Sequence, residues 1–502
     1  MRVLFVTSEV YPLAKTGGLA DVSSALPHAL ALQGIDVRIL LPGYPSALAG
    51  LKSPQIEARL DSLLGVTDAT LISGYLPDTG VPVWLIDAPS LFRRCGGLYQ
   101  NGHGQDWSDN ALRFAFFAHA AAKVAGGMMG WKPDVVHAND WHAGLLPLLL
   151  SMEKAPRPAT VFTIHNLAFQ GNFPREVLTN IGIQDNCFDA DGMEFYGQAS
   201  FLKAAIRYSD KVTTVSPTYA KEVLTPEFGC GMDGVLRSRG EDFSGILNGI
   251  DDDLWSPATD LHLPHTYSAR DISGKRICKA ALQRQLGLEV SPATPLIGFV
   301  SRLAHQKMAD VVMEAVPAIL ERGAQFVLVG EGDAAIESGF EALGRKYGSS
   351  IAIRIGYEEA RAHQLQAGAD ILLAPARFEP CGLTQLYASR YGTIPVVRKT
   401  GGLADTVTDA VTSDRTPTGF LFEDPDLPSL LGAIDRALTL YREPLSWRRM
   451  QLHAMARDFS WSKSAEKYTA LYQEVSGVPN CATWEPAVST TSSPEVERQV
   501  MR

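Results

Sequence analysis

Short runs of apolar residues recur along the first half of the chain, and their length is typical of buried strands. They lie at residues 3–7, 37–41, 83–86, 135–138, 161–164 and 212–215. Helical patterns separate them, from Asp21 to about Gln33 and from Ser108 to Ala125, where Ser108 is expected to cap its helix. Strands that alternate with helices predict a doubly wound parallel sheet, so we assign residues 1–245 to one domain of this kind.

The same alternation restarts after residue 245. Strands are predicted at 296–301, 326–329, 351–355, 371–374, 394–397 and 419–422, and helices at 426–441, 446–457 and 462–475. Residues 246–457 are therefore expected to form a second doubly wound domain that faces the first, with residues 248–257 as the hinge. Pro, Ser and Thr accumulate in residues 477–502, which is typical of a loose tail. The predicted fold class is α/β, with two Rossmann-like domains.

One stretch of the second half, residues 370–405, contains the densest signals. An apolar run from Asp370 to Pro375 predicts a strand, which a tight loop connects to a helix at residues 383–391. The free N–H groups and partial positive charge at such a helix start suit a diphosphate. Glu379 stands in the loop, where a carboxylate can accept hydrogen bonds from sugar hydroxyls. An ordinary strand-to-helix connection is the alternative interpretation.

A seven-residue sequence, KTGGLAD, occurs at residues 15–21 and again at residues 399–405. Both copies place glycine amides at a predicted helix start, and Lys15 adds a cation to the first copy. This combination predicts a site for phosphate or sugar hydroxyls. Arg302 and Lys307 place two further cations in the loop after another strand, and both side chains are common phosphate ligands. Surface lysines and a salt-bridged loop are the competing explanations.

Histidines cluster in the segment HANDWH at residues 137–142, but their spacing does not fit a zinc helix motif. We expect Asp140 and Trp141 to line a polar cleft that accepts carbohydrate. His165 ends the following strand, at the edge of the sheet where α/β proteins bind ligands. Tyr357 follows a strand of the second domain and either stacks on a base or belongs to the core.

The composition argues against several classes of partner. The chain has 502 residues, of which 46% are hydrophobic and 20% charged, as in globular proteins with full cores. A net charge of −10 argues against nucleic acid and anionic membranes. With no apolar stretch of about 18 residues and no evident signal peptide, the cytoplasm is the expected location. Six scattered cysteines without a CxxC pair indicate neither a zinc site nor a disulfide framework.

Three consecutive aspartates, Asp251 to Asp253, contain the Asp-x-Asp pattern with which many nucleotide-sugar enzymes bind a divalent cation. They lie between NGI and WSP, a context that is typical of a polar turn at a domain junction. The loops described above provide no second acidic cluster, although a hard cation needs several oxygen ligands. We therefore expect that the protein requires neither a metal ion nor another cofactor.

The order and spacing of eight segments resemble bacterial glycogen synthase and plastid starch synthase: KTGGLADV, HANDWHAGL, TIHNLAFQG, NGID, SRLAHQK, VGEGD, GYEE and RFEPCGLTQLYASRYGTIPVVRKTGGLADTV. The resemblance covers residues 1–475. It implies a GT-B fold with an active site between the domains, and a terminal helix, residues 458–476, that returns to the first domain. It also implies transfer of glucose from ADP-glucose to the non-reducing end of an α-1,4-glucan, glycogen, with retention at the anomeric carbon.

The resemblance implies roles for individual residues. Arg302 and Lys307 would bind the donor diphosphate, Glu379 the glucose hydroxyls and Tyr357 the adenine, while His165 would approach the sugar. The other residues expected to contact donor or glucan are Lys15, Gly18, Asp21, Tyr99, Asp140, Trp141, Asn248, Cys381, Gly382, Leu383 and Thr384. 

Two positions depart from the family pattern. Met308 follows Lys307 where the family usually has glycine, so we expect the loop to adopt a helical or extended conformation there. Phe169 stands where the family often has tyrosine.

Three other functions are alternatives to glucose transfer from ADP-glucose. A UDP-sugar enzyme with another acceptor is the main alternative, because the residues do not reveal the preferred base. An oxidoreductase would need a GxGxxG loop after the first strand, which KTGGL does not supply. A sugar-nucleotide sensor without activity would have lost Glu379 or the cation pair, and all three are present. Primer preference, oligomeric state and allosteric control are not evident from the sequence.

Overall fold

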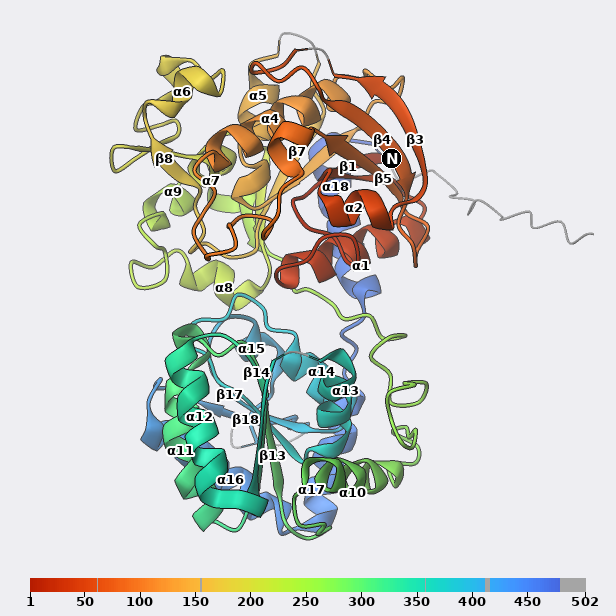
Figure 1. Cartoon of the computed structure of the whole chain (residues 1–502), viewed down its shortest axis with the longest axis vertical. Coiled ribbons are helices and arrows are strands. Elements are labelled where there is room, and N and C mark those ends of the chain that lie inside the picture. The colour runs from red at the N-terminus through yellow and green to blue at the C-terminus, as the bar shows by residue number, and fades with distance from the viewer. Residues whose placement is uncertain (61, 154–155, 357, 411–415, 479–502) are drawn as a thin grey trace, which may run out of the picture.

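Two sheets, each with helices on both faces, form the two halves of the molecule (Figure 1). The computed structural model describes residues 1–60, 62–153, 156–356, 358–410 and 416–478. Within this part of the chain the first sheet has nine strands, in the order β12 (Phe243–Gly245), β11 (Lys211–Thr214), β7 (Ala159–Ile164), β6 (Val135–Asn139), β1 (Arg2–Val6), β2 (Asp36–Pro42), β5 (Pro82–Asp87), β4 (Thr70–Tyr75) and β3 (Lys52–Arg59). The pairs β4–β5 and β3–β4 are antiparallel, and the others are parallel.

Helices of three to 16 residues connect the strands of the first domain, and a small antiparallel sheet extends from it. The described helices are α1 (Gly18–Leu32), α2 (Pro45–Gly50), α3 (Pro89–Phe92), α4 (Asn110–Ala125), η1 (Trp141–Ala143), α5 (Leu146–Ser151), α6 (Val177–Asn180), η2 (Asp185–Cys187), α7 (Phe201–Tyr208), α8 (Pro217–Glu222), α9 (Asp233–Arg237) and η3 (Gly240–Asp242). The small sheet comprises β8 (Asn172–Pro174), β10 (Gln198–Ser200) and β9 (Glu194–Phe195).

The second sheet is parallel throughout. Its six described strands run in the order β15 (Ile351–Ile355), β14 (Gln325–Gly330), β13 (Leu296–Val300), β16 (Ile371–Ala374), β17 (Ile394–Arg398) and β18 (Phe420–Phe422). One face carries η4 (His305–Lys307), α11 (Ala309–Glu321), α12 (Ala334–Tyr347), η5 (Gly348–Ser350) and α16 (Leu427–Tyr441). The other carries α10 (Gly274–Leu286), α13 (Glu359–Gly368), α14 (Thr384–Arg390) and α17 (Pro444–Met455), and α15 (Gly401–Thr406) lies at the end toward the first domain (Figure 1).

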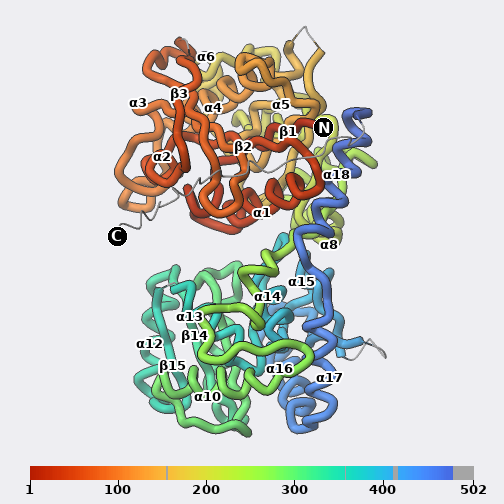
Figure 2. The backbone as a smooth tube through the Cα atoms, turned by 90° about the vertical axis from the view of Figure 1, so that its right-hand side faces the viewer, coloured from red at the N-terminus to blue at the C-terminus, as the bar shows by residue number. Residues whose placement is uncertain are grey.

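The last helix, α18 (Trp461–Ser476), packs on the first domain beside α1. Tyr468 and Tyr472 are fully buried in the core of that domain, and the hydroxyl of Tyr472 lies 2.7 Å from Nδ1 of His137. The chain therefore passes between the domains twice. The two passages lie side by side, because the N–H of Ile250 donates to the carbonyl of Phe459 at 2.8 Å (Figure 2).

The segment that follows the first passage has no helix or strand among its described residues 251–273, yet it is firmly anchored to the second domain. Trp255 is buried and stacks on His363 at 3.7 Å and on Tyr387 at 3.8 Å between ring centroids. His363 in turn contacts the carboxylate of Asp260 at 2.7 Å. None of the helices in the described part of the chain combines the length and apolar character needed to cross a membrane.

Candidate active site

In both sheets the order of strands reverses beside the first strand of the domain. β1 lies between β2 and β6, and β13 lies between β14 and β16. In each sheet the chain first adds strands on one side of this first strand and later crosses to its other side. Ligands of α/β proteins bind at the carboxyl ends of strands at such points. Five of the predicted residues lie in loops at the carboxyl ends of these central strands: Lys15 follows β1, Asp140 follows β6, Arg302 and Lys307 follow β13, and Glu379 follows β16.

The carboxyl edges of the two sheets face one another. Ser216, which follows β11, donates from Oγ to the carbonyl of Pro380 in the other domain at 2.6 Å. The pKa of Asp21 is raised mainly by desolvation, and Glu359 at the start of α13 adds to the shift. The first turn of α1, which contains Asp21, therefore lies near the second domain, so the residues predicted from the two halves share one region.

In the second domain, the ammonium group of Lys307 contacts the carboxylate of Glu379, which is 8% exposed. Further hydrogen bonds join their loops. Arg377 donates from its backbone N–H to the Gln306 carbonyl at 2.8 Å and from Nη1 to the His305 carbonyl at 2.5 Å, and Gln306 Nε2 donates to the Phe378 carbonyl at 3.1 Å. Arg302 precedes them with an exposed side chain. Its Nη2 donates to Oε1 of Gln306 at 3.4 Å, so both predicted cations belong to the loop that contacts the Glu379 loop.

Met308 corrects the expectation for this loop. Its backbone is in the left-handed region, with φ 51° and ψ 31°, rather than helical or extended. The side chain is fully buried in the core between β13, α11 and their neighbours. The loop thus follows a path that suits glycine, and burial of the methionine side chain offsets part of the strain.

The loop after Glu379 turns directly into α14, as predicted. Gly382 has φ 76°, Leu383 is the N-cap residue and Thr384 begins the helix. Burial raises the pKa of the Cys381 thiol to about 12, so this side chain is a poor nucleophile. The amides of residues 382 and 383 precede the helix and that of Thr384 belongs to its first turn, and sugar or phosphate is the ligand predicted for them.

In the first domain, His165 is fixed through its ring. Its Nε2 lies 2.9 Å from Oδ1 of Asn139, whose Nδ2 donates to the carbonyls of Val6 and His137. Because an amide oxygen only accepts, Nε2 of His165 carries the proton and Nδ1 is left as an acceptor. Burial lowers the pKa of His165 to about 3, so the ring is neutral near pH 7.

Asp140 and Trp141, which are predicted to line a polar cleft, are both largely buried. Asp140 is buried with φ 54°, and its Oδ1 accepts the N–H of His165 at 2.8 Å, so it holds the His165 backbone from behind. Burial raises the pKa of Asp140 to about 7. Trp141 is 9% exposed and packs among Phe114, Phe173 and other rings of the core. The apolar character of the indole therefore serves the core of the domain.

The loop of Lys15 is organised by a residue that the sequence reasoning missed. Glu9 accepts the N–H of Thr16 at 2.7 Å and that of Gly17 at 3.0 Å, and it accepts the hydroxyl of Tyr99 at 2.8 Å. The predicted ligand Tyr99 thus supports the loop from inside. Glu9 follows β1 almost directly, and its position at the carboxyl end of a central strand was the signal that could have identified it.

Lys15 itself donates to Asp21 Oδ1 at 2.7 Å, with about 40% of its side chain exposed. The space around Gly18 is open, since a Cβ there would meet no atom within 4 Å. In the second copy of the repeat a Cβ at Gly401 would lie 1.8 Å from the Glu379 carbonyl oxygen, and one at Gly402 would lie 2.2 Å from that of Cys381. Packing therefore requires the glycines of the second copy but not Gly18.

Two predicted ligands remain. Asn248 is buried at the first passage between the domains, its N–H reaches the sulfur of Cys381, and its Oδ1 has no hydrogen-bond partner among the described residues. Tyr357 lies outside the described residues.

Asp251 forms the predicted turn at this junction. Its Oδ1 accepts the N–H groups of Asp253 at 3.1 Å and Leu254 at 3.0 Å. Within the described part of the chain, no three His, Cys, Asp or Glu side chains are grouped so as to hold a metal ion.

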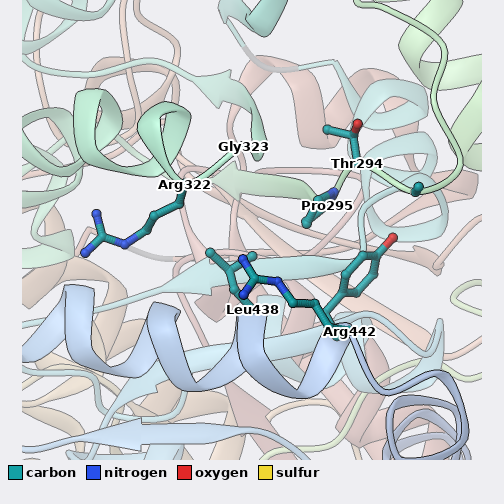
Figure 3. Close-up of a pocket in the computed structure, with 8 residues that line it drawn as sticks. Thr294, Pro295, Arg322, Gly323, Leu438 and Arg442 are labelled. Carbon is teal, nitrogen blue, oxygen red and sulfur yellow. The ribbon is translucent and has the colours of Figure 1, made fainter.

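A separate hollow of about 250 Å³ lies at the opposite end of the second sheet (Figure 3). Pro295 and Gly323, which line it, precede β13 and β14, so the hollow is at the amino ends of these strands. Of its two arginines, Arg322 is paired with Asp435 at 2.6 Å. This position is remote from the carboxyl ends where the predicted residues gather.

Comparisons with known proteins agree with this arrangement. Residues 2–238 match the family model of the starch synthase catalytic domain, and residues 294–439 match that of group 1 glycosyl transferases. Glycogen synthase of Burkholderia thailandensis is 52% identical over 93% of this chain and 90% of its own length. Glycogen synthase of Paramagnetospirillum magneticum is 50% identical over 95% and 98%.

A solved structure, the catalytic domain of starch synthase IV from Arabidopsis thaliana bound to ADP and acarbose, matches with a TM-score of 0.85 and 35% identity. The match covers 95% of this chain and 99% of that one, and it confirms the predicted GT-B fold. Strand order, site position and sequence similarity lead to one conclusion: the chain belongs to the glycogen synthase and starch synthase family of glycosyltransferases.

Proposed function

We propose that the protein transfers glucose from ADP-glucose to the non-reducing end of an α-1,4-glucan, with retention, and so elongates glycogen. The observation that carries the proposal is the Lys307–Glu379 contact at the carboxyl edge of the second sheet, in the loop whose Pro380 carbonyl accepts a hydrogen bond from Ser216 of the first domain. A cation and a carboxylate thus lie together near the domain junction, which suits a diphosphate and the hydroxyls of the sugar attached to it. Relatives named glycogen synthase, and a structural neighbour described as bound to ADP and acarbose, support this donor and acceptor.

The second domain supplies the charge that the leaving group needs. The bond between the anomeric carbon and the bridging oxygen breaks, and its electron pair leaves with ADP, so negative charge grows on the diphosphate. Arg302 and Lys307 lie where they can bind it, and the three N–H donors of Lys307 allow simultaneous contact with Glu379. Charge-assisted hydrogen bonds contribute about 1.5–3 kcal/mol each, so the two cations supply about two to four decades of rate.

The first domain positions the sugar. Neutral His165 presents Nδ1 as an acceptor for a sugar hydroxyl, and Asp140 holds the backbone of His165 in place. Retention through two displacements would need a carboxylate nucleophile, whereas the carboxylate of Glu379 is engaged by Lys307. We therefore propose a front-face reaction. The acceptor hydroxyl bonds to the anomeric carbon on the side from which ADP departs, and its proton passes to the leaving phosphate.

The test is transfer to glycogen from ADP-glucose and from UDP-glucose, both in excess chelator. We expect transfer from ADP-glucose, with kcat reduced at least a hundredfold by Lys307→Ala while glycogen binding is unchanged, because Lys307 meets charge that grows in the transition state. Preference for UDP-glucose would favour the alternative donor, and the absence of transfer from either donor, both in chelator and after Mg²⁺ or Mn²⁺ is restored, would refute the proposal. Activity that requires added Mg²⁺ or Mn²⁺, and is lost in Asp251→Asn, would refute metal independence.

A further inference from the structure

Two short helices, one from each domain, hold each other by reciprocal hydrogen bonds where the domains meet (Figure 1). Asp405, in α15, accepts the N–H of Thr218 at 2.8 Å and its hydroxyl at 2.7 Å, at the start of α8. Glu222, the last residue of α8, accepts the hydroxyl of Thr400 at 3.0 Å and the N–H of Gly401 at 2.9 Å, at the start of α15. Each helix therefore supplies a carboxylate to the other.

The α15 side of this contact is joined to the Glu379 loop. Gly402 N–H donates to the carbonyl of Glu379 at 3.2 Å, and the Gly401 backbone is so close to that carbonyl that no side chain fits between them. The next carbonyl, of Pro380, accepts the hydroxyl of Ser216, which immediately precedes α8. A displacement of α15 relative to the first domain would therefore displace the backbone of Glu379.

The α8 side is joined to the His165 loop. Tyr219 is buried, and its hydroxyl accepts the N–H of Leu167 at 3.2 Å, two residues after His165. Ser216 and Tyr219 thus connect α8 to a loop of each domain. The paired helices form the bridge between the Glu379 loop and the His165 loop.

We propose that Glu222 and Asp405 are positioning residues that fix the Glu379 loop of one domain against the His165 loop of the other. This inference rests on the proposed function for its kinetic consequence. Neither residue is among those expected to contact the donor or the acceptor. Without these bonds each domain keeps its own half of the site, but the two halves lose their mutual alignment, to which group transfer is sensitive.

The kinetic test uses Glu222→Ala, Glu222→Gln and, as matched control, Glu227→Ala, which removes an exposed carboxylate from the segment after α8. We expect Glu222→Ala to lower kcat at least tenfold, with the KM for ADP-glucose and the Kd for ADP within twofold of the parent values. The glutamine amide oxygen can take the place of Oε1, which accepts both bonds, so Glu222→Gln should stay within threefold of the parent. Glu227→Ala should match the parent.

The proposal would be overturned by a parent-like kcat in Glu222→Ala or by failure of Glu222→Gln to restore kcat. It would also be overturned if Glu222→Ala lost as much affinity for ADP as it lost kcat. Amide hydrogen exchange without substrate provides a readout that does not depend on the reaction. Exchange should accelerate at least fivefold at residues 400–403 and 166–168 in Glu222→Ala and stay unchanged in α12, and unchanged exchange in the two loops would also overturn it. If the parent does not transfer glucose from ADP-glucose, the proposed function fails, while the exchange result still decides the role of the junction.

Discussion

The two copies of KTGGLAD show how the same residues serve different purposes. In the second copy Gly401 has φ 43° and almost touches the Glu379 carbonyl, so the fold itself demands glycine. In the first copy the space beside Gly18 is open and Gly17 has an extended backbone that any residue adopts. The open space at Gly18 leaves room for a ligand to approach its backbone, as is predicted for the donor.

Gly18→Ala and Gly401→Ala should therefore fail in different ways. We expect Gly18→Ala to keep the parent's melting temperature, because the methyl group meets no atom and alanine favours helices. Its KM for ADP-glucose should rise at least tenfold, because the methyl group occupies the space where the donor approaches. Gly401→Ala should lose about 1–3 kcal/mol of stability to backbone strain, with a further loss from the steric clash. Calorimetry and initial rates measure both effects, and a Gly18→Ala variant with unchanged KM would exclude Gly18 from the donor site.

At the scale of elements, the buried parallel strands were the predictable part. The six strands predicted in each half fall within two residues of observed strands, because strands buried on both faces read as continuous apolar runs. Strand β3 was not predicted, because its residues are almost all exposed and form no apolar run. Ser108 was predicted to cap a helix, whereas α4 begins at Asn110 after Asp109, whose carboxylate pairs with Arg94.

The candidate site was predictable as far as motif residues ended strands. Lys15, Arg302, Lys307 and Glu379 were found in this way, and the structure places them on the facing edges of the two sheets. Glu222 was not found, because its partners Thr400 and Gly401 are almost 180 residues away and no local pattern marks such a pair. The burial of Asp140 and Trp141, which were predicted to line a polar cleft, was not foreseen, because a motif does not reveal which side chains pack against the core.

Substitutions of Met308 compare the strain of its left-handed backbone with the stability gained by burying its side chain. Replacing it with glycine removes about 1–2 kcal/mol of left-handed strain but also loses about 1.5–3 kcal/mol of side-chain burial. Met308→Ala loses most of the burial and keeps the strain, so we expect alanine to be more destabilising than glycine, the reverse of the usual order. Urea unfolding of the three proteins measures this. If alanine were the more stable variant, the left-handed conformation of residue 308 would be wrong.

At the scale of the whole molecule, α18 fixes the end of the second domain to the core of the first. His137, in the central strand β6, is the polar centre of this contact: Nδ1 lies 2.7 Å from the Tyr472 hydroxyl and Nε2 lies 2.6 Å from Oγ1 of Thr163. The imidazole is fully buried, with Tyr468 and Phe5 against its ring. Burial, with a smaller contribution from His165, lowers the pKa of His137 to about 3.

This pKa shift makes the attachment of α18 sensitive to acid. The unfolded chain binds a proton at His137 near pH 6.5, while the folded chain binds it only near pH 3. Between these values the unfolded state holds more protons, so the contribution of His137 to stability is complete above pH 6.5 and is lost progressively below it. From pH 7.5 to pH 5.5 the loss is about 1.4 kcal/mol. Asp140, whose raised pKa of about 7 acts in the opposite direction, prevents this value from being read from the parent alone.

The measurement is therefore a difference between proteins. The free energy of unfolding of the parent minus that of His137→Gln should fall by about 1.4 kcal/mol between pH 7.5 and pH 5.5, because the variant lacks this titration and retains the others. Tyr472→Phe is the matched control: it removes the hydroxyl that His137 contacts but keeps the buried imidazole, so its pH dependence should follow that of the parent. Hydrogen exchange in α18 should accelerate at the lower pH in the parent, relative to its intrinsic rate, and not in His137→Gln. A parent-minus-variant difference that does not change with pH would show that His137 titrates alike in the folded and unfolded chains, and acid sensitivity of the domain attachment would then have to come from another group.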